Sequence, residues 1–203
     1  DIATSADGAF DVHVADMDGD GDLDIVSASS DDDTIAWYEN DGAADPTWSA
    51  ADIATSADGA YDVHVADMDG DGDLDIVSAS YVDNLINWHE NDGNVNPSWT
   101  TSKVNVGFGL DDVFGIQVGD MDGDGDMDIV SASHDDNKIA WYENDGNANP
   151  TWTGSNIYGL YGAFDVFVED MDNDGDLDIV SISKTQDSVS WHENDGNANP
   201  TWT

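Results

Sequence analysis

The chain contains no cysteine and only three basic residues among its 203 positions. The lack of cysteine excludes disulfides as the link that holds small units together, although bound metal can supply that stabilisation instead. With 46 acidic residues the net charge is −43, which disfavours DNA, RNA and anionic membrane surfaces as partners. No apolar run approaches the roughly 20 residues that cross a bilayer. Divalent cations and cationic surfaces are the partners that this charge favours.

In contrast, a nine-residue acidic run occurs four times. The copies span Asp16–Asp24, Asp67–Asp75, Asp120–Asp128 and Asp170–Asp178. Each has aspartates at positions 1, 3, 5, 7 and 9 and a glycine at position 6, a pattern typical of a calcium loop because Ca²⁺ takes six to eight oxygen ligands. Without a cation, carboxylates this close would repel one another. We therefore predict about four Ca²⁺ ions per chain.

The same spacing shows that the whole chain is an array of repeats. Two sets of tryptophans recur with it, one beginning at Trp37 and one at Trp48. We place the repeats at residues 1–51, 52–102, 103–154 and 155–203, together forming one repeat domain. The sequence lacks an initiator methionine and a signal peptide, so we expect a mature product or a segment of a longer protein.

Each repeat predicts four short strands and no helix. In the first repeat, apolar and polar residues alternate over 10–14, which is the period of a half-buried strand. A second strand follows the acidic loop, a third covers 35–38, and a fourth runs from Trp48 to about Ile53, with Asn40-Asp41-Gly42 forming a turn.

About 50 residues in four strands bury too little surface to fold alone, so neighbouring repeats must stack. The predicted fold class is all-β, with four tandem four-stranded β-meander blades of β-propeller type. The blades either close into a ring or stack as an open, filamentous array.

These residues resemble the FG-GAP and VCBS-type repeats, including the calcium-binding blades of integrin α-subunit propellers. The resemblance rests on Phe114-Gly115, on the four acidic loops, and on the segment from Ile35 to Gly42. It implies calcium in the loop between the first two strands of each blade. Four repeats leave open a single ring, a ring shared by two chains, and a continuous fibre.

Carried over by position, the resemblance implies these side-chain ligands: Asp16, Asp18, Asp20 and Asp24; Asp67, Asp69, Asp71 and Asp75; Asp120, Asp122, Asp124 and Asp128; and Asp170, Asp172, Asp174 and Asp178. The seventh residue of each loop would add its backbone carbonyl, which gives Asp22, Asp73, Asp126 and Asp176.

The aromatic residues and histidines allow two interpretations each. The tryptophans are either packing groups between repeats or platforms for sugar rings, and we favour packing, more strongly for the Trp37 set than for the Trp48 set. The five histidines lie at alternating polar positions, where we expect exposure. Their spacing predicts no zinc site.

We expect no catalysis, because the clustered acids are committed to metal and the sequence has neither a nucleophile elbow nor a cysteine. Three stretches depart from the repeat, namely Lys103–Asp112, Asn156–Gly162 and Lys184–Asp187, and we interpret them as variable loops.

The predicted function is a non-catalytic, calcium-stabilised structural or adhesive protein of the cell surface, secreted into a filament, stalk or adhesin. The near-identity of the first two repeats favours this, since a scaffold repeats one interface whereas a binding protein diversifies its loops. We expect self-association through repeat stacking or strand completion, with glycans or cell-surface proteins as further partners. The alternatives are a carbohydrate-binding, lectin-like module and an accessory domain of a secreted enzyme.

Overall fold

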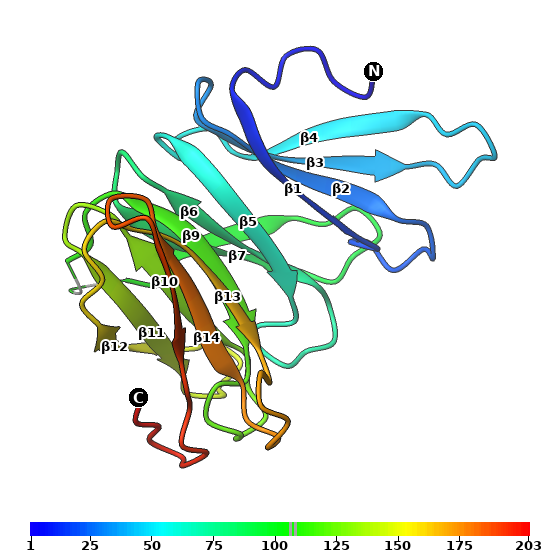
Figure 1. Cartoon of the computed structure of the whole chain (residues 1–203). Helices are drawn as coiled ribbons and strands as arrows, with labels where there is room; N and C mark the ends of the chain where they lie inside the picture. Colours follow the sequence, from blue (N-terminus) through cyan, green and yellow to red (C-terminus); the bar gives the residue numbers. More distant parts are fainter. Residues whose placement is uncertain (106, 108) are drawn as a thin grey trace. The chain divides into compact units, whose positions relative to one another are not determined.

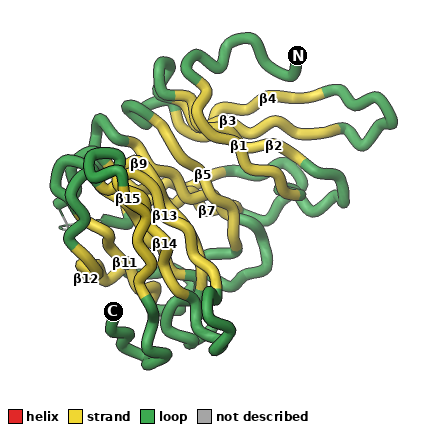
Figure 2. Tube along the Cα trace, in the orientation of Figure 1, coloured by secondary structure: helices red, strands yellow, loops and turns green. Residues whose placement is uncertain are grey.

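The computed structural model describes residues 1–105, 107 and 109–203, and within these residues every regular element is a β-strand. The strands form four antiparallel meander sheets in which each strand pairs with its neighbours in chain order (Figure 1). The tube in Figure 2 alternates between strands and connecting loops along the described chain. The predicted all-β class with four meander sheets is confirmed.

The four sheets repeat the same strand pattern. The first contains β1 (Ala9–Ala15), β2 (Asp24–Ser29), β3 (Thr34–Asn40) and β4 (Trp48–Ala54). The second contains β5 (Ala60–Ala66), β6 (Asp75–Ser80), β7 (Leu85–Asn91) and β8 (Trp99–Lys103). The third contains β9 (Val113–Gly119), β10 (Asp128–Ser133), β11 (Lys138–Asn144) and β12 (Trp152–Tyr158). The fourth contains β13 (Ala163–Glu169), β14 (Asp178–Ser183) and β15 (Ser188–His192).

The fourth sheet has three strands among the described residues, so the expected fourth strand of this repeat is wrong. Only an isolated bridge joins Asn194 to Trp202, supported by a reciprocal pair of backbone bonds between Glu193 and Thr203 at 3.1 Å. Thr203 occupies the repeat position of Ser49, the second residue of β4.

The register of each sheet is fixed close to its acidic loop. Val14 pairs with Ile25 and Ala15 pairs with Asp24, so the loop closes the β1–β2 hairpin directly. The next turn places Asp33 at φ +57°, in the left-handed region that Asp and Asn tolerate best among residues other than glycine. The residues of the two turns therefore determine how β1 connects to β2 and how β2 connects to β3.

The sheets divide between two compact units, each described here by itself. One unit comprises Asp1–Asp67 and Asp71–Lys103, and the other comprises Met68–Gly70 and Val104–Thr203. Each unit has a core between its two sheets. In the first unit the core residues are Met17, Val26, Ala28, Ile35, Trp37, Ala57, Ala60, Val63 and Ile76. In the second they are Met121, Val130, Ala132, Ile139, Trp141, Leu160, Ala163, Val166 and Ile179.

The expected exposure of the histidines is wrong for two of them. His89 and His192 are buried, and their Nε2 atoms lie 2.9 Å from Ser78 Oγ and 2.8 Å from Ser181 Oγ, respectively. Alternation along a strand separates its two faces but does not reveal whether the polar face is later covered by another element. His13, His64 and His134 are partly buried.

The stretches that depart from the repeat fall mainly in connections. Lys184–Asp187 forms the turn between β14 and β15, whereas Asn156–Gly162 begins in β12 and ends in a turn. The stretch Lys103–Asp112 includes Val106 and Phe108, which lie outside the described residues. The described residues include no helix with the length and apolarity needed to span a membrane.

Candidate metal centres

The first acidic loop connects β1 to β2 and is organised by its own carboxylates. The oxygens of Asp16 accept hydrogen bonds from the backbone N–H groups of Asp20 at 3.1 Å and Gly21 at 2.9 Å. Asp18 accepts a bond from the N–H of Asp20 at 3.2 Å, and Asp20 accepts one from the N–H of Asp22 at 2.9 Å. Gly21 has φ +96°, which explains the glycine at position 6.

The aspartate at position 9 joins this loop to the third strand. Asp24 is buried, and its Oδ2 accepts a hydrogen bond from the N–H of Met17 at 3.1 Å. Its Oδ1 accepts another from the N–H of Asn40, the last residue of β3, at 2.9 Å. The Asp24 carboxylate therefore stabilises the fold through these hydrogen bonds, in addition to any role as a cation ligand.

The other loops repeat this position-9 geometry. Asp128 and Asp178 accept the equivalent pairs of bonds. The N–H of Asn91 donates to Asp75 at 2.8 Å.

Each loop brings three carboxylates together. In the first loop, one oxygen each from Asp16, Asp18 and Asp24 lies within 4.8 Å of the others. Two oxygens that each lie about 2.4 Å from a shared Ca²⁺ are at most about 4.8 Å apart, so this donor set fits the ion in both chemistry and spacing. The equivalent groups are Asp67, Asp69 and Asp71; Asp120, Asp122 and Asp128; and Asp170, Asp172 and Asp174.

Positions 5 and 9 enter these groups unequally. Asp71 and Asp174 belong to the groups of the second and fourth loops, whereas the groups of the first and third loops contain the position-9 residue instead. Among the described residues, Asp20, Asp75, Asp124 and Asp178 lie outside these groups of three. Their ligation stays a prediction, as does ligation by every loop carboxylate.

Among the described residues, the side chains at position 7 belong to none of these groups of three carboxylates. The Asp22 carboxylate lies beside Gly42 of the following turn, so that a Cβ added to Gly42 would stand 2.0 Å from Asp22 Oδ2. Asp73, Asp126 and Asp176 lie in the same way beside Gly93, Gly146 and Gly196. This placement is compatible with the predicted use of the backbone carbonyl at position 7.

The electrostatics of the loops favour a cation. Loss of hydration raises the pKa of Asp18 and of Asp122, and nearby carboxylates raise both further. Burial raises the pKa of Asp128 to about 7, against the opposing effect of its hydrogen bonds. A divalent cation reverses these costs, because it stabilises the ionised form of every carboxylate around it.

Comparison with known families identifies the repeat. The FG-GAP-like repeat model matches residues 16–78, 67–131 and 120–181. This chain belongs to the FG-GAP-like repeat family. Each match runs from one acidic loop through the next, so the FG-GAP-like unit links the loops of two successive sheets. The resemblance inferred from the sequence is confirmed.

A solved structure shares the fold of these FG-GAP-like repeats. It is a lectin from Agrocybe aegerita that specifically recognises non-reducing terminal N-acetylglucosamine, with a TM-score of 0.59 and 22% sequence identity. The alignment covers 92% of this chain and 49% of the lectin chain, so the chain spans about half the length of the lectin. A search of the curated proteins finds no significant match.

The tryptophans of the FG-GAP-like repeats serve mainly as packing groups. Trp37, Trp88 and Trp141 are buried, which confirms the core interpretation for them, whereas Trp191 is exposed. Trp99 packs against the core of the first unit and meets Trp37 edge-on, with ring centroids 6.5 Å apart. In the second set, Trp48, Trp99, Trp152 and Trp202 are all partly buried.

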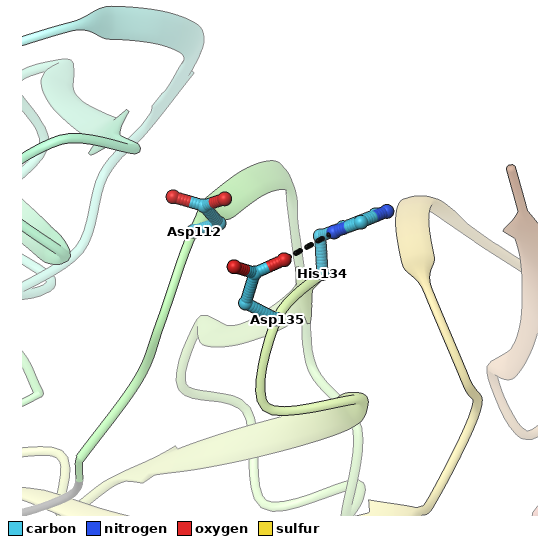
Figure 3. A group of neighbouring side chains, drawn as sticks. All are labelled: Asp112, His134 and Asp135. Carbon is cyan, nitrogen blue, oxygen red and sulfur yellow. Dashed lines mark hydrogen bonds and ion pairs between the residues drawn. The ribbon is translucent and has the colours of Figure 1, made fainter. Parts of the chain in front are cut away.

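A second cluster breaks the symmetry of the FG-GAP-like repeats. Asp112, His134 and Asp135 converge at one end of β9 and β10 (Figure 3), and one ligand atom from each lies within 4.8 Å of the others. Asp112 has φ +56° at a position held elsewhere by Gly8, Gly59 and Gly162. Burial raises the pKa of Asp112, and the charges of Asp135 and Asp111 raise it further.

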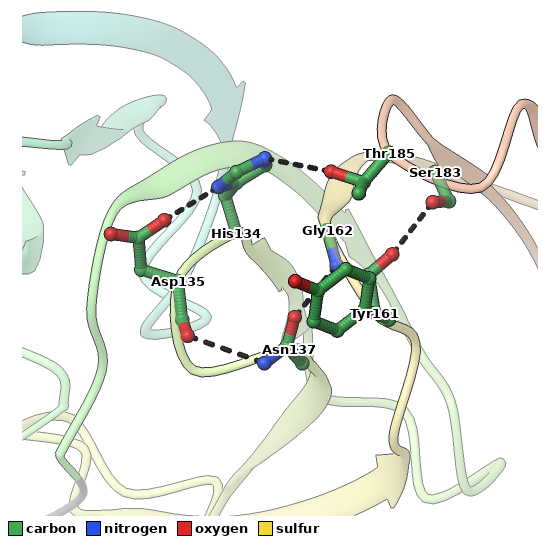
Figure 4. A network of polar contacts seen from close by, with 7 residues as sticks. All are labelled: His134, Asp135, Asn137, Tyr161, Gly162, Ser183 and Thr185. Atoms are coloured by element: carbon green, nitrogen blue, oxygen red, sulfur yellow. Dashed lines mark hydrogen bonds and ion pairs between the residues drawn. The ribbon is translucent and has the colours of Figure 1, made fainter.

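Hydrogen bonds hold His134 in this cluster (Figure 4). Its Nδ1 lies 2.7 Å from Asp135 Oδ1, and its Nε2 lies 3.3 Å from Thr185 Oγ1. A pocket of about 340 Å³ opens beside these groups, lined also by Phe114, Phe164 and Lys184. Sequence reasoning missed this site, although an aspartate in place of a repeated glycine was a signal that could have located it.

Proposed function

We propose that this chain is a non-catalytic, calcium-stabilised structural or adhesive repeat protein that forms part of an extracellular filament, stalk or adhesin. Its sheets are arranged as β-propeller-type blades, either closed in a ring or continued as an array, and the chain associates with itself through stacking or strand completion. Extracellular calcium loops bind at about 10⁻⁴–10⁻³ M, so a calcium-rich medium would keep them loaded.

The observation that carries this proposal is the recurrence of a group of three carboxylates in all four loops of an FG-GAP-like chain. A catalytic site is normally built once, whereas a structural site recurs with the unit that it stabilises. Each loop closes the first hairpin of its sheet, so a cation there acts on the placement of strands. In this proposal, calcium offsets the repulsion within a chain of net charge −43.

Calcium titration tests the proposal. At a calcium concentration ten times the dissociation constant, each site adds about 1.4 kcal/mol of stability. With two loops per unit of about 100 residues, this raises the melting temperature by roughly 10–20 °C relative to excess EDTA. Calorimetric titration should give about four Ca²⁺ per chain. An unchanged melting temperature in EDTA at low salt would refute the proposal.

Two substitutions in one loop provide a matched pair. Asp18→Asn removes a carboxylate of the donor group. Asp22→Asn removes the same charge but keeps its backbone carbonyl, and its side chain lies beside Gly42. We expect Asp18→Asn to weaken binding of the ion in the first loop, because a neutral amide oxygen replaces a carboxylate, and Asp22→Asn to leave the affinity of all four ions unchanged. Equal losses would mean that binding reflects total charge rather than a built site.

Glycan binding is the second candidate, favoured by the pocket that Phe114, Phe164 and Lys184 line with polar neighbours. Aromatic faces suit sugar rings, and the lectin with the shared fold is weakly consistent with this function. Glycan-array binding that disappears in Lys184→Ala but persists in Lys103→Ala would support it. Binding that instead requires Trp48 would place the sugar at the other tryptophan set.

A third candidate is an accessory domain of a secreted enzyme. The FG-GAP-like array carries no feature that favours this over a scaffold. A catalytic domain in the same reading frame as residues 1–203 would decide in its favour.

A further inference from the structure

Both units are built on one pair of faces. In the first unit, the earlier sheet contributes the Trp face, which we define as the repeat positions held by Met17, Val26, Ala28, Ile35 and Trp37. The later sheet contributes the Val face, defined as the positions held by Ala57, Ala60, Val63 and Ile76. The core of the second unit uses the equivalent positions throughout. The same interface is therefore formed twice within the chain.

The first sheet carries a Val face that is not covered. It consists of Ala6, Ala9, Val12 and Ile25. Val12 is 61% exposed, whereas its equivalents Val63 and Val166 are 1% and 3% exposed. A groove of about 190 Å³ lies over this face and is lined by all four of its residues.

The last sheet carries an uncovered Trp face. It consists of Met171, Val180, Ile182, Val189 and Trp191. Trp191 is 47% exposed, whereas Trp37 and Trp141 are each 5% exposed. Val189 is 72% exposed, whereas isoleucine is fully buried at the equivalent positions of the first and third sheets. Exposed apolar side chains gathered on one face mark an interaction surface.

We propose that the Trp face of the last sheet binds the Val face of the first sheet in a second copy of this chain. The interface that joins the two sheets of each unit would thus also form between two chains. Both surfaces of the new contact are therefore already complementary. This inference rests on the structural role proposed above and names the surfaces through which copies associate.

The contact is heterologous, because each copy uses a different face. Such an interface leaves one free face of each kind in a pair, so it continues into a filament or closes when the rotation between copies allows a ring. Two copies that each carry a charge of −43 repel one another. Since the faces are apolar, added salt should strengthen association by screening this repulsion.

The experiment uses single aspartate substitutions at exposed valines in residues 1–203. Val12→Asp disables the Val face, Val189→Asp disables the Trp face, and Val95→Asp is the control, since Val95 lies between β7 and β8 and is 69% exposed. The mass of each variant is measured by light scattering over a range of protein concentration in saturating calcium. Circular dichroism checks that each variant is folded.

We expect the wild type and Val95→Asp to form species that are multiples of 21.7 kDa and to grow with protein concentration and salt. Val12→Asp and Val189→Asp should each stay at one chain. Their equimolar mixture should form a two-chain species, because the intact Trp face of Val12→Asp binds the intact Val face of Val189→Asp.

Three results would overturn the proposal: a wild type that stays at one chain, association that both face variants retain, and variants whose mixture gives no two-chain species. The stoichiometry of bound calcium, measured on Val12→Asp, separates these failures from a failure of the proposed function. Four ions per chain without association would leave the calcium scaffold intact and reject only the contact between copies.

Discussion

Replacing Asp24 should separate the structural work of an acidic loop from its metal binding. The buried Asp24 carboxylate accepts hydrogen bonds from the N–H groups of Met17 and Asn40. Asp24→Ala leaves both donors without a partner, at roughly 1–3 kcal/mol for a buried donor and less for a partly exposed one. We therefore expect a loss of about 2–4 kcal/mol in the free energy of unfolding, even without calcium.

Asp18→Ala is the matched comparison in the same loop. Loss of hydration and the neighbouring carboxylates raise the pKa of Asp18, so removing its charge relieves repulsion when no cation is bound. In EDTA this variant should be close to the wild type in stability. In calcium both variants lose the same site, worth about 2.7 kcal/mol at a hundred times the dissociation constant.

Urea denaturation followed by tryptophan fluorescence measures both effects, because Trp37 lies in the core that Met17 also joins. The four conditions, two variants with and without calcium, give a double comparison. Equal stabilities of Asp24→Ala and Asp18→Ala in EDTA would refute the structural role of position 9. If Asp24→Ala loses stability only in the presence of calcium, Asp24 acts solely as a metal ligand.

Two further substitutions test the burial of His89 and the close approach of Gly42 to Asp22. Burial holds the pKa of His89 at about 4, below its ordinary 6.5, so the unfolded chain takes up the proton first and stability falls as the pH drops from about 6.5 to about 4, by up to about 1.4 kcal/mol per unit. His89→Tyr introduces the residue found at the equivalent positions 38 and 142. Between pH 7 and pH 5 in saturating calcium, the stability of this variant should fall less with pH than that of the wild type. Urea midpoints that fall equally with pH in both proteins would contradict the role of His89. Gly42→Ala should destabilise by about 1–2 kcal/mol, chiefly because φ +67° is strained for a residue with a Cβ, with a smaller addition from the contact of that Cβ with the Asp22 carboxylate. Adding Asp22→Ala should recover the steric part of the loss and leave the backbone cost, and no recovery would locate the clash elsewhere.

The strands and loops could be predicted because their determinants are local. Alternation over 10–14 and the spacing of aspartates and glycines lie within single hairpins, and β1 and β2 formed where this pattern placed them. The convergence of three carboxylates in each loop follows from the same local spacing.

The features that escaped prediction depend on what covers a face. His89 occupies a polar position of its strand, yet it is buried with its Nδ1 2.8 Å from Thr101 Oγ1 on the neighbouring strand. Trp191 matches Trp37 in sequence but is exposed, because no second sheet of its unit packs on that face. Equivalent residues thus differ in burial for reasons of stacking, which periodicity within one repeat does not contain.

The candidate site beside Asp112 escaped for a different reason. The repeat pattern indicates only the residues that recur, whereas Asp112 and His134 each occupy a position that holds other residues in the remaining repeats. Their convergence depends on the pairing of β9 with β10, which brings two separate connections to one end of the sheet. Residues that depart from the repeat can therefore form a site where strand pairing brings two of them together.

The acidic loops and the apolar cores are parts of one mechanism. Position 2 of a loop supplies Met17 to the core of the first unit, and position 8 of the next loop supplies Leu74 to the same core. Met121 and Leu177 play these roles in the second unit. Ions that fix two successive loops would thus fix the side chains that enter the core between two sheets. In the proposed function, calcium would thereby set how one sheet stacks on the next, and the same stacking would propagate through the exposed faces at which a second copy is proposed to bind.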